Sequence, residues 1–176
     1  EQHLQETPAP PVTISKRIVF GSNRDGNWEI YLMQDDESHL TRLTDNPAED
    51  TFPVWSPDGR SLAFLRMVGW AKPVLVIHSL YGNEDVSERE LKTVDGGLAW
   101  SPDGRNLAVY YSTEIEPSSL IYLCSVDGAQ RVRVTEPLDG RRVEDDNPVF
   151  SHDGKWLYFT RHIKGHGSFV CRRAID

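Results

Sequence analysis

Three aspartates stand at equivalent places in a repeated pattern. Each precedes a motif Trp or Phe by five residues, and the three are Asp50, Asp95 and Asp145. If the fold brings these carboxylates together, they could hold a hard cation such as calcium or receive a basic group of a partner. In the alternative interpretation, each aspartate accepts backbone hydrogen bonds and fixes the start of its own repeat. The recurrence of the same residue in successive units favours this second interpretation.

Tryptophans near loops are the second group that could recognise a partner. Trp70 lies in an irregular stretch from Met67 to Lys72, where an exposed indole would anchor a protein partner. Alternatively, Trp70 closes that long loop onto its sheet in a small satellite cluster. Trp55 and Trp100 adjoin the repeated turn, and we expect them to pack between sheets.

The remaining reactive side chains form no catalytic pattern. His162 and His166 flank a glycine-containing turn and lack further ligands, which indicates a solvated hairpin tip. Cys124 and Cys171 occupy equivalent positions in consecutive units, beyond the ~7 Å Cα limit of a disulfide, so we expect free thiols. The sequence has no nucleophile elbow, phosphate loop or zinc-binding helix. We therefore expect no enzymatic activity, although missing motifs leave open an unusual lyase site of scattered Arg, His and Asp.

The elements that must position these residues are repeated about four times. The motif Trp-Ser-Pro-Asp-Gly at 55–59 returns at 100–104 and, as Phe-Ser-His-Asp-Gly, at 150–154. Ser-Pro-Asp-Gly is tight-turn chemistry, since proline presets φ and glycine takes the last position without steric cost. A short apolar run follows each turn, and a fourth copy of that run is found at 18–20. Such regular turns between short runs predict 13 to 15 strands and no long helix.

The second strand of each unit is apolar on both faces. Ile18 and Phe20 point to one side of their strand and Val19 to the other. A sheet with one wet face would alternate apolar and polar residues, so each sheet should be covered on both sides. Four-stranded antiparallel sheets stacked face to face around an axis form a β-propeller. In a propeller the first strands line the channel, and the three aspartates would converge near its mouth.

Residues 22–33, 40–44 and 50–59 together closely resemble the WD-like repeat of TolB-type β-propellers. The resemblance extends from about residue 17 to residue 176 and is strongest in the first unit. The repeats predict blades at about 17–49, 50–94, 95–144 and 145–176, after an N-terminal arm or linker at 1–16. The family includes a periplasmic partner of the peptidoglycan-associated lipoprotein, gating domains of prolyl-oligopeptidase-like enzymes and oligogalacturonide lyases. It therefore implies a fold more sharply than a function.

The strand count departs from the six-bladed rings that the resemblance implies. The first unit has strands two to four of the repeat, and the last unit has strands one to three. Nine acidic residues against two arginines give −7 over 21–59, whereas five basic residues against one acid give +4 over 155–176. These complementary ends predict either one four-bladed ring, completed by the arm at 11–15, or a homodimeric ring of seven or eight blades. In the third alternative, the ends stay exposed and the charges reflect loop composition.

Composition restricts the partners. The net charge of −8 disfavours nucleic acid and anionic membranes, and no apolar window is long enough to span a bilayer. A polar start without methionine, taken with the resemblance, indicates a trimmed N-terminus and a periplasmic or extracellular location. We expect a non-catalytic propeller module that binds a protein or small ligand at its channel mouth and loops, with no cofactor unless calcium binds. The alternatives are a propeller domain of a larger prolyl-oligopeptidase-like enzyme and a metal-dependent saccharide lyase.

Overall fold

The computed structural model describes residues 16–69, 71–80, 88–112 and 118–175. These residues form fourteen β-strands and no helix, so the predicted strand number is confirmed. No helix that could cross a membrane is found in this part of the chain. The strands form four antiparallel sheets, which we call blades 1 to 4 in chain order. The predicted arm, except for Lys16, and Trp70 lie outside the described residues.

Blades 1 and 2 contain the first seven strands. Blade 1 has the order β1-β2-β3, and blade 2 has the order β4-β5-β6-β7. The strands are β1 (Arg17–Ser22), β2 (Glu29–Gln34), β3 (Thr41–Arg42), β4 (Glu49–Trp55), β5 (Ser61–Met67), β6 (Val74–Ser79) and β7 (Glu88–Thr93).

Blades 3 and 4 contain the other seven strands, in the orders β8-β9-β10-β11 and β12-β13-β14. The strands are β8 (Gly96–Trp100), β9 (Asn106–Tyr111), β10 (Leu120–Ser125), β11 (Arg131–Arg133), β12 (Val143–Phe150), β13 (Trp156–Ile163) and β14 (Gly167–Ala174). Within the described residues, blade 1 lacks the first strand of the repeat and blade 4 lacks the fourth, as the sequence predicts.

The repeated turn between the first two strands of a blade is fixed by one set of hydrogen bonds. The Ser56 hydroxyl donates to Asp58 (2.6 Å), and the backbone N–H of Arg60 donates to the same carboxylate (3.0 Å). The backbone N–H of Ser61 donates back to the Ser56 hydroxyl oxygen (2.9 Å). Gly59 has a φ of 67°, which only glycine adopts without cost. The same bonds recur in the turns of blades 3 and 4.

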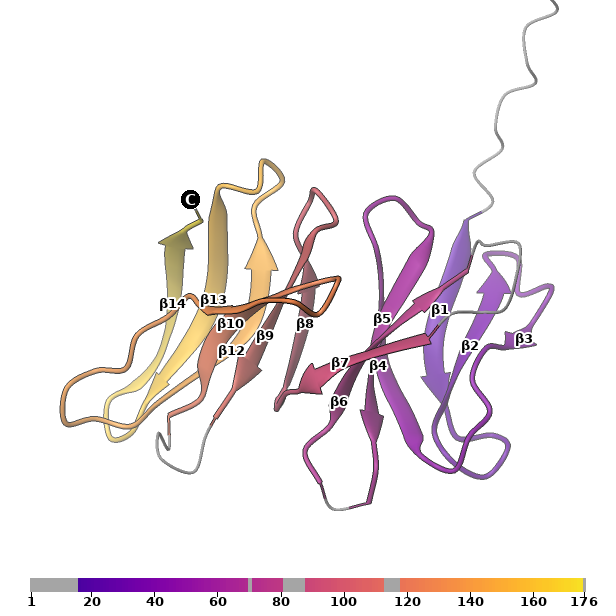
Figure 1. The fold of residues 1–176 in the computed structure, drawn as a ribbon, viewed down its shortest axis with the longest axis horizontal. Coiled ribbons are helices and arrows are strands. Elements are labelled where there is room, and N and C mark those ends of the chain that lie inside the picture. Colours follow the sequence, from indigo (N-terminus) through magenta and orange to yellow (C-terminus); the bar gives the residue numbers. More distant parts are fainter. Residues whose placement is uncertain (1–15, 70, 81–87, 113–117, 176) are drawn as a thin grey trace, which may run out of the picture.

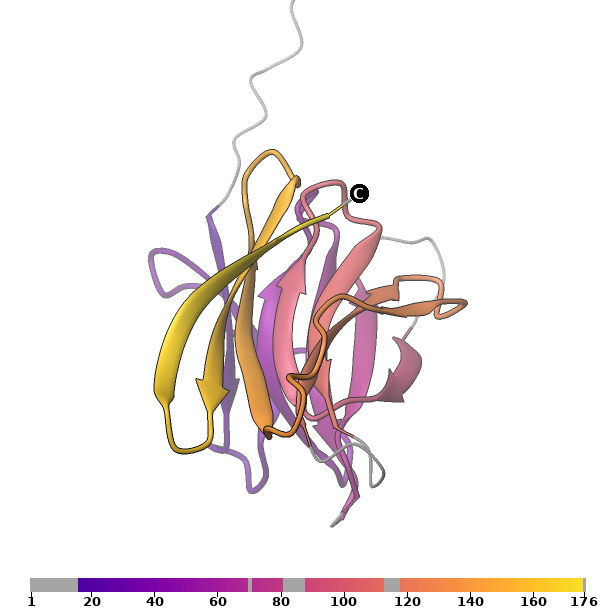
Figure 2. The same ribbon diagram turned by 90° about the vertical axis from the view of Figure 1, so that its left-hand side faces the viewer.

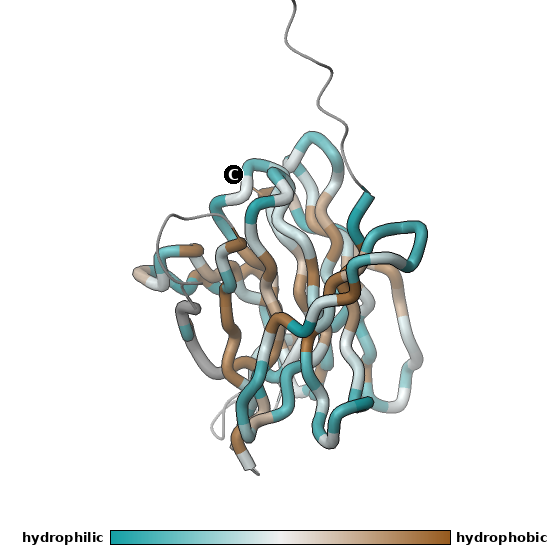
Figure 3. Tube along the Cα trace, turned by 90° about the vertical axis from the view of Figure 1, so that its right-hand side faces the viewer, coloured by the Kyte–Doolittle hydropathy of each residue, from teal (hydrophilic) through white to brown (hydrophobic). Residues whose placement is uncertain are grey.

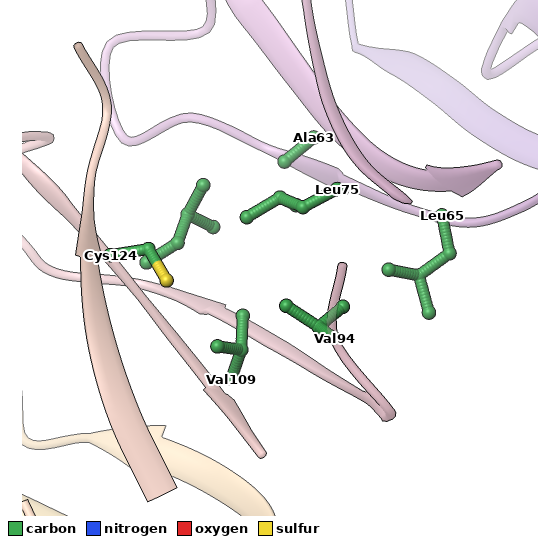
Figure 4. Close-up of a cluster of buried hydrophobic side chains, with 7 residues drawn as sticks. Ala63, Leu65, Leu75, Val94, Val109 and Cys124 are labelled. Atoms are coloured by element: carbon green, nitrogen blue, oxygen red, sulfur yellow. The ribbon is translucent and has the colours of Figure 1, made fainter. Parts of the chain in front are cut away.

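The four blades stack face to face in one row (Figure 1). An apolar cluster lies between each pair of neighbours. Figure 4 shows the cluster between blades 2 and 3, where Leu75 faces Val109 and Cys124. Trp55 and Trp100 pack against two of these clusters, which confirms their predicted place between sheets. Both cysteines are free thiols, as predicted.

The sequence predicts a neighbour on both faces of every sheet, and among the described residues this is wrong for the two end blades. No described strand of blade 1 contacts blade 4, and the two lie at opposite ends of the row (Figure 1). In Figure 2, β14 lies foremost, with no further strand over it. Residues 16–69, 71–80, 88–112 and 118–175 therefore form an open row and do not by themselves close into a four-bladed ring. The apolar pattern of a strand indicates that its faces can pack against other sheets, but it does not specify which sheets these are.

Candidate functional site

Asp50 and Asp145 are each held by an arginine of their own blade. Arg66, directly opposite Asp50 on the next strand, donates from Nε and Nη2 to the two carboxylate oxygens at 2.8 Å each. Arg161 makes the same bidentate contact with Asp145 at 2.6 Å each. Both aspartates are fully buried. Guanidinium groups therefore hold these desolvated carboxylates at the start of the first strand, whereas the structural interpretation of the sequence expects backbone hydrogen bonds.

Asp95 is held differently because Tyr111 occupies the place of the arginine. Lys72, from the loop between β5 and β6, contacts Asp95 at 2.6 Å. The Ser112 hydroxyl donates to the other carboxylate oxygen at 2.6 Å. Lys72 also donates to the Ser112 carbonyl, so the loop of blade 2 is tied to blade 3. In this loop the sequence predicts Trp70 as the residue that could make a contact. The contact that the structure describes is made by Lys72.

The structure does not bring the three aspartates into one cation site. In the part of the chain that the structure describes, no three Asp, Glu, His or Cys side chains cluster as metal ligands do. Asp50 and Asp145 already face guanidinium groups, which compete with any cation for the same oxygens. Asp95 alone of the three lines the surface hollow described next.

A β-bulge occurs at the same position in the first strand of blades 2, 3 and 4. The strand pairing shifts register at each of these places. Phe52, Gly97 and Asn147, three residues before the motif aromatic, have φ values of 54°, 64° and 49°. This left-handed conformation costs an L-residue roughly 1–2 kcal/mol, and for a bulky residue such as Phe it is an outlier. Bulges re-aim side chains and are frequent beside binding sites.

The three bulges border a hollow of about 410 Å³ where the first strands of blades 2, 3 and 4 lie side by side. We call it the inner-edge hollow. Each blade supplies part of its wall: Phe52, Pro53, Val54 and Leu65 from blade 2, Gly96, Gly97, Leu98 and Tyr110 from blade 3 together with Asp95 before β8, and Asp146 and Asn147 from blade 4. Phe52 lies at its border and is 72% exposed.

Tyr110 forms one wall of the hollow. It packs so closely on the backbone that a Cβ on Gly96 would overlap its hydroxyl group. A Cβ on Gly97 would lie 2.8 Å from the Tyr110 ring and 2.9 Å from Pro148. Burial, followed by the negative charges of Asp146 and Asp95, raises the pKa of Tyr110. The phenol is therefore held neutral beside two carboxylates, and it can donate a hydrogen bond.

The hollow combines an apolar rim with negative charge. The side chain of Asp146 is partly exposed, and its Oδ2 lies 3.3 Å from Nε2 of His162. An occupant with an aliphatic or aromatic stem and a basic tip would contact Phe52 and Leu98 with the stem and the Asp146 carboxylate with the tip. No side chain in the hollow is placed as a nucleophile activated by a neighbouring base.

The bulges were not identified from the sequence, although a signal was present. Pro53 and Pro148 stand at the same position of two first strands, where an uninterrupted ladder would need an N–H donor. Proline in a strand marks an edge or a bulge. The sequence contains no comparable signal for the exposure of Phe52, because a phenylalanine in a strand is ordinarily buried.

No protein-family model matches the chain. The chain is 32% identical over 144 residues to a protein TolB homolog of Chlorobium chlorochromatii and 29% identical over 156 residues to the uncharacterized peptidase YuxL of Bacillus subtilis. These matches include 82% and 84% of this chain but only 31% and 20% of the relatives, so the chain spans less than a third of either. TolB from Acinetobacter baumannii superposes with a TM-score of 0.66 at 17% identity, over 92% of this chain and 42% of that one.

The stacked antiparallel sheets, with bulged first strands along one edge, define an array of β-propeller blades. The sequence relatives specify the kind of propeller: the chain belongs to the TolB-like β-propeller family, as its WD-like repeats predict.

Proposed function

We propose that this chain is a non-catalytic binding module that holds a segment of a protein partner in the inner-edge hollow. The observation that carries the proposal is Phe52, a large apolar side chain in a left-handed conformation and mostly exposed. Both the backbone strain and the exposed ring cost free energy in the isolated chain. Such costs persist where the surrounding structure fixes them for a purpose such as binding.

The chemistry of the hollow favours a basic segment. Asp146 provides negative charge and Tyr110 adds a neutral hydroxyl group, whereas Asp95 is already paired with Lys72. The whole chain carries a net charge of −8, which would attract a basic partner before contact. A lysine or arginine beside an apolar residue would therefore fit best.

Selection from a phage-displayed library of random short peptides tests the proposal. We expect enriched peptides to carry Lys or Arg beside an apolar residue. Their affinity, measured by calorimetry, should fall about tenfold in Phe52→Ala, as for a central aromatic anchor. Asp146→Asn should weaken the preference for basic peptides. Val132→Ala, on the exposed outer strand β11, is the matched control and should leave affinity unchanged.

Two results would reject this function. The first is a selection that enriches no peptide over an unrelated display target. The second is a set of peptides that bind Phe52→Ala and Asp146→Asn as tightly as the unaltered chain. Far-UV circular dichroism of each variant separates a lost fold from lost binding.

A second candidate function is that of a propeller domain within a larger enzyme. It is favoured by the 29% identity to a peptidase of which this chain matches only 20%. Under this proposal the hollow would contact a peptide substrate near a catalytic domain elsewhere in the polypeptide. Hydrolysis of fluorogenic peptides by the protein that the complete native gene encodes would support this function. If that protein hydrolyses none of the peptides, this function is rejected.

We further propose a periplasmic location, which the TolB resemblance implies. Fractionation of cells that express the complete native gene tests this location. Recovery of the protein in the cytoplasmic fraction would contradict it.

A further inference from the structure

A guanidinium group is held between blades 1 and 2, beside the repeated turn of blade 2. Arg17 begins β1, and its Cζ lies 5.0 Å from the centre of the Trp55 ring. Its Nη2 also donates to the backbone carbonyl of Gly59 at 3.2 Å. A planar, charged group with several N–H donors can stack on an indole and bond a carbonyl at the same time. The indole and the turn carbonyl of blade 2 therefore bind an arginine that blade 1 provides.

The equivalent of this arginine in blade 2 is a serine. Arg17 is paired with Gln34 where β1 begins and β2 ends. Ser61 is paired with Ser79 where β5 begins and β6 ends. The two residues thus hold the same place at the start of a second strand. A serine side chain stops at its hydroxyl group, so Ser61 does not extend to the place that a guanidinium would take.

A hollow of about 510 Å³ lies at this place between blades 2 and 3. We call it the turn-side hollow. Ser61 lines it from blade 2, and Trp100 and Gly104 line it from blade 3. In the repeat, Trp100 corresponds to Trp55 and Gly104 to Gly59. The hollow therefore has both groups that hold a guanidinium in the preceding junction, and among the described residues that line it none is an arginine or a lysine.

Two carboxylates add negative charge to the turn-side hollow. Asp58 and Asp103, from the repeated turns of blades 2 and 3, both line it. The hydrogen bonds of each turn end on Oδ1 of its aspartate, so the second oxygen of each takes no part in the turn. The hydroxyl groups of Ser56 and Ser101 lower the pKa of these carboxylates, which are therefore ionised at neutral pH. A cation in the hollow is attracted by both.

The turn-side hollow and the inner-edge hollow lie at opposite ends of β8. Trp100, the last residue of this strand, lines the first, and Gly96, its first residue, lines the second. Figure 3 shows hydrophilic residues mainly in the turns at the strand ends and apolar residues mainly within the strands. Trp100 therefore provides an aromatic wall among hydrophilic turns. Its Nε1 donates to the Val54 carbonyl at 3.4 Å, and a ring fixed in this way loses little freedom on binding.

We propose that the turn-side hollow is a binding site for the side chain of an arginine from a partner protein. The guanidinium group stacks on Trp100 and donates to the Gly104 carbonyl, as in the preceding junction. It also faces the carboxylates of Asp58 and Asp103. Lysine suits the site less well, because an ammonium group is not planar and is more strongly hydrated. The two hollows share no lining residue, so this site is independent of the proposed function.

Titration with N-acetyl-arginine amide, followed by NMR, tests the site. The probe should shift the indole N–H signal of Trp100, which Trp100→Phe identifies, along a saturable curve. N-acetyl-lysine amide at the same ionic strength should bind at least about threefold more weakly, since it stacks less well on an indole. Asp58→Asn combined with Asp103→Asn keeps a hydrogen-bond acceptor in both turns. This double variant should bind the arginine probe about fivefold more weakly, as for the loss of partly exposed ion pairs.

Ser61→Arg provides the most direct test. Its guanidinium group should occupy the turn-side hollow as Arg17 occupies the preceding junction. Because a tethered group competes at a high effective concentration, the affinity for N-acetyl-arginine amide should fall about tenfold or more. Val132→Arg adds the same charge on the exposed strand β11 and is the matched control, which should leave the affinity unchanged. Asp146→Asn should also leave it unchanged, which separates this site from the inner-edge hollow.

Two results would overturn the inference. In the first, the Trp100 signal stays in place up to the solubility limit of the arginine probe, or both probes shift it equally. In the second, Ser61→Arg binds the arginine probe as tightly as Val132→Arg does. Circular dichroism of each variant shows whether the fold is retained. If Ser61→Arg does not fold, the double variant of Asp58 and Asp103 decides, and an unchanged affinity there would reject the site.

Discussion

Replacing Phe52 by alanine and by glycine should reverse the usual order of stability of these two residues. In a strand, glycine is ordinarily less stable than alanine by roughly 0.5–1 kcal/mol, because it loses more conformational entropy on folding. At a φ of 54°, alanine pays the left-handed penalty of roughly 1–2 kcal/mol and glycine does not. The penalty exceeds the entropy cost, so Phe52→Gly should be more stable than Phe52→Ala by up to about 1 kcal/mol.

The loss of the ring itself cancels from this comparison. Phe52 is 72% exposed, so both variants remove little buried area, and they differ from each other only in the Cβ atom. Urea unfolding followed by fluorescence gives the free energy of unfolding of each variant. A difference of about 1 kcal/mol corresponds to roughly 2–4 °C in the melting temperature for a chain of this size.

Val149 provides the matched control. It is an exposed residue of a first strand, and its φ is not positive. There the usual order should hold, with Val149→Gly less stable than Val149→Ala. If Phe52→Ala proves as stable as Phe52→Gly, the left-handed conformation of Phe52 is refuted, and with it the strain on which the proposed binding site depends.

The other predictions concern the charged residues of the repeat. Arg161→Met should lower the free energy of unfolding by about 3–5 kcal/mol in urea titrations, because it leaves Asp145 buried and unpaired. The double variant Arg161→Met with Asp145→Leu should recover part of this loss. Equal losses in the single and the double variant would contradict the argument. The Ser56 hydroxyl and the Arg60 backbone N–H lower the pKa of Asp58, so this carboxylate stabilises the fold above its unfolded pKa of about 4, and that stability is lost as the pH falls through the lowered pKa. Between neutral and acid pH, the melting temperature of Ser56→Ala should fall less than that of the unaltered chain. An identical dependence of melting temperature on pH in the two proteins would argue against this turn as the cause. Millimolar calcium should leave the melting temperature unchanged, and an upward shift would revive the cation site.

The repeat length and the turn chemistry made the fold predictable from the sequence. Ser-Pro-Asp-Gly specifies a tight turn by local conformational preference, and its hydrogen bonds join residues at most five positions apart. The apolar runs between turns could therefore be assigned to strands, and the missing strands of both end units could be counted. Trp55 and Trp100 could be placed between sheets because a large apolar side chain beside a fixed turn has few other places to be buried.

Local preference did not decide how the aspartates are used. An Asp at the start of each first strand suits either a shared cation site or a separate structural role. The arginine opposite Asp50 decides between them, and that pairing depends on the strand register 16 residues further along the chain. Opposite Asp95 the strand register places Tyr111 instead of an arginine, and Lys72 of blade 2 forms the ion pair with Asp95.

The sequence by itself determined the class of the fold, the number of strands and the apolar character of both faces of each blade, because these follow from turns and periodicities within one repeat. Only the tertiary structure decided that Phe52 is exposed in a left-handed bulge, since a bulge is a property of two paired strands. Only the tertiary structure decided, too, that within the described residues Val170 and Ile18 lie exposed at the ends of the row. Burial depends on what lies beside a residue, and the same repeated position is covered in the middle of the row and exposed at its ends.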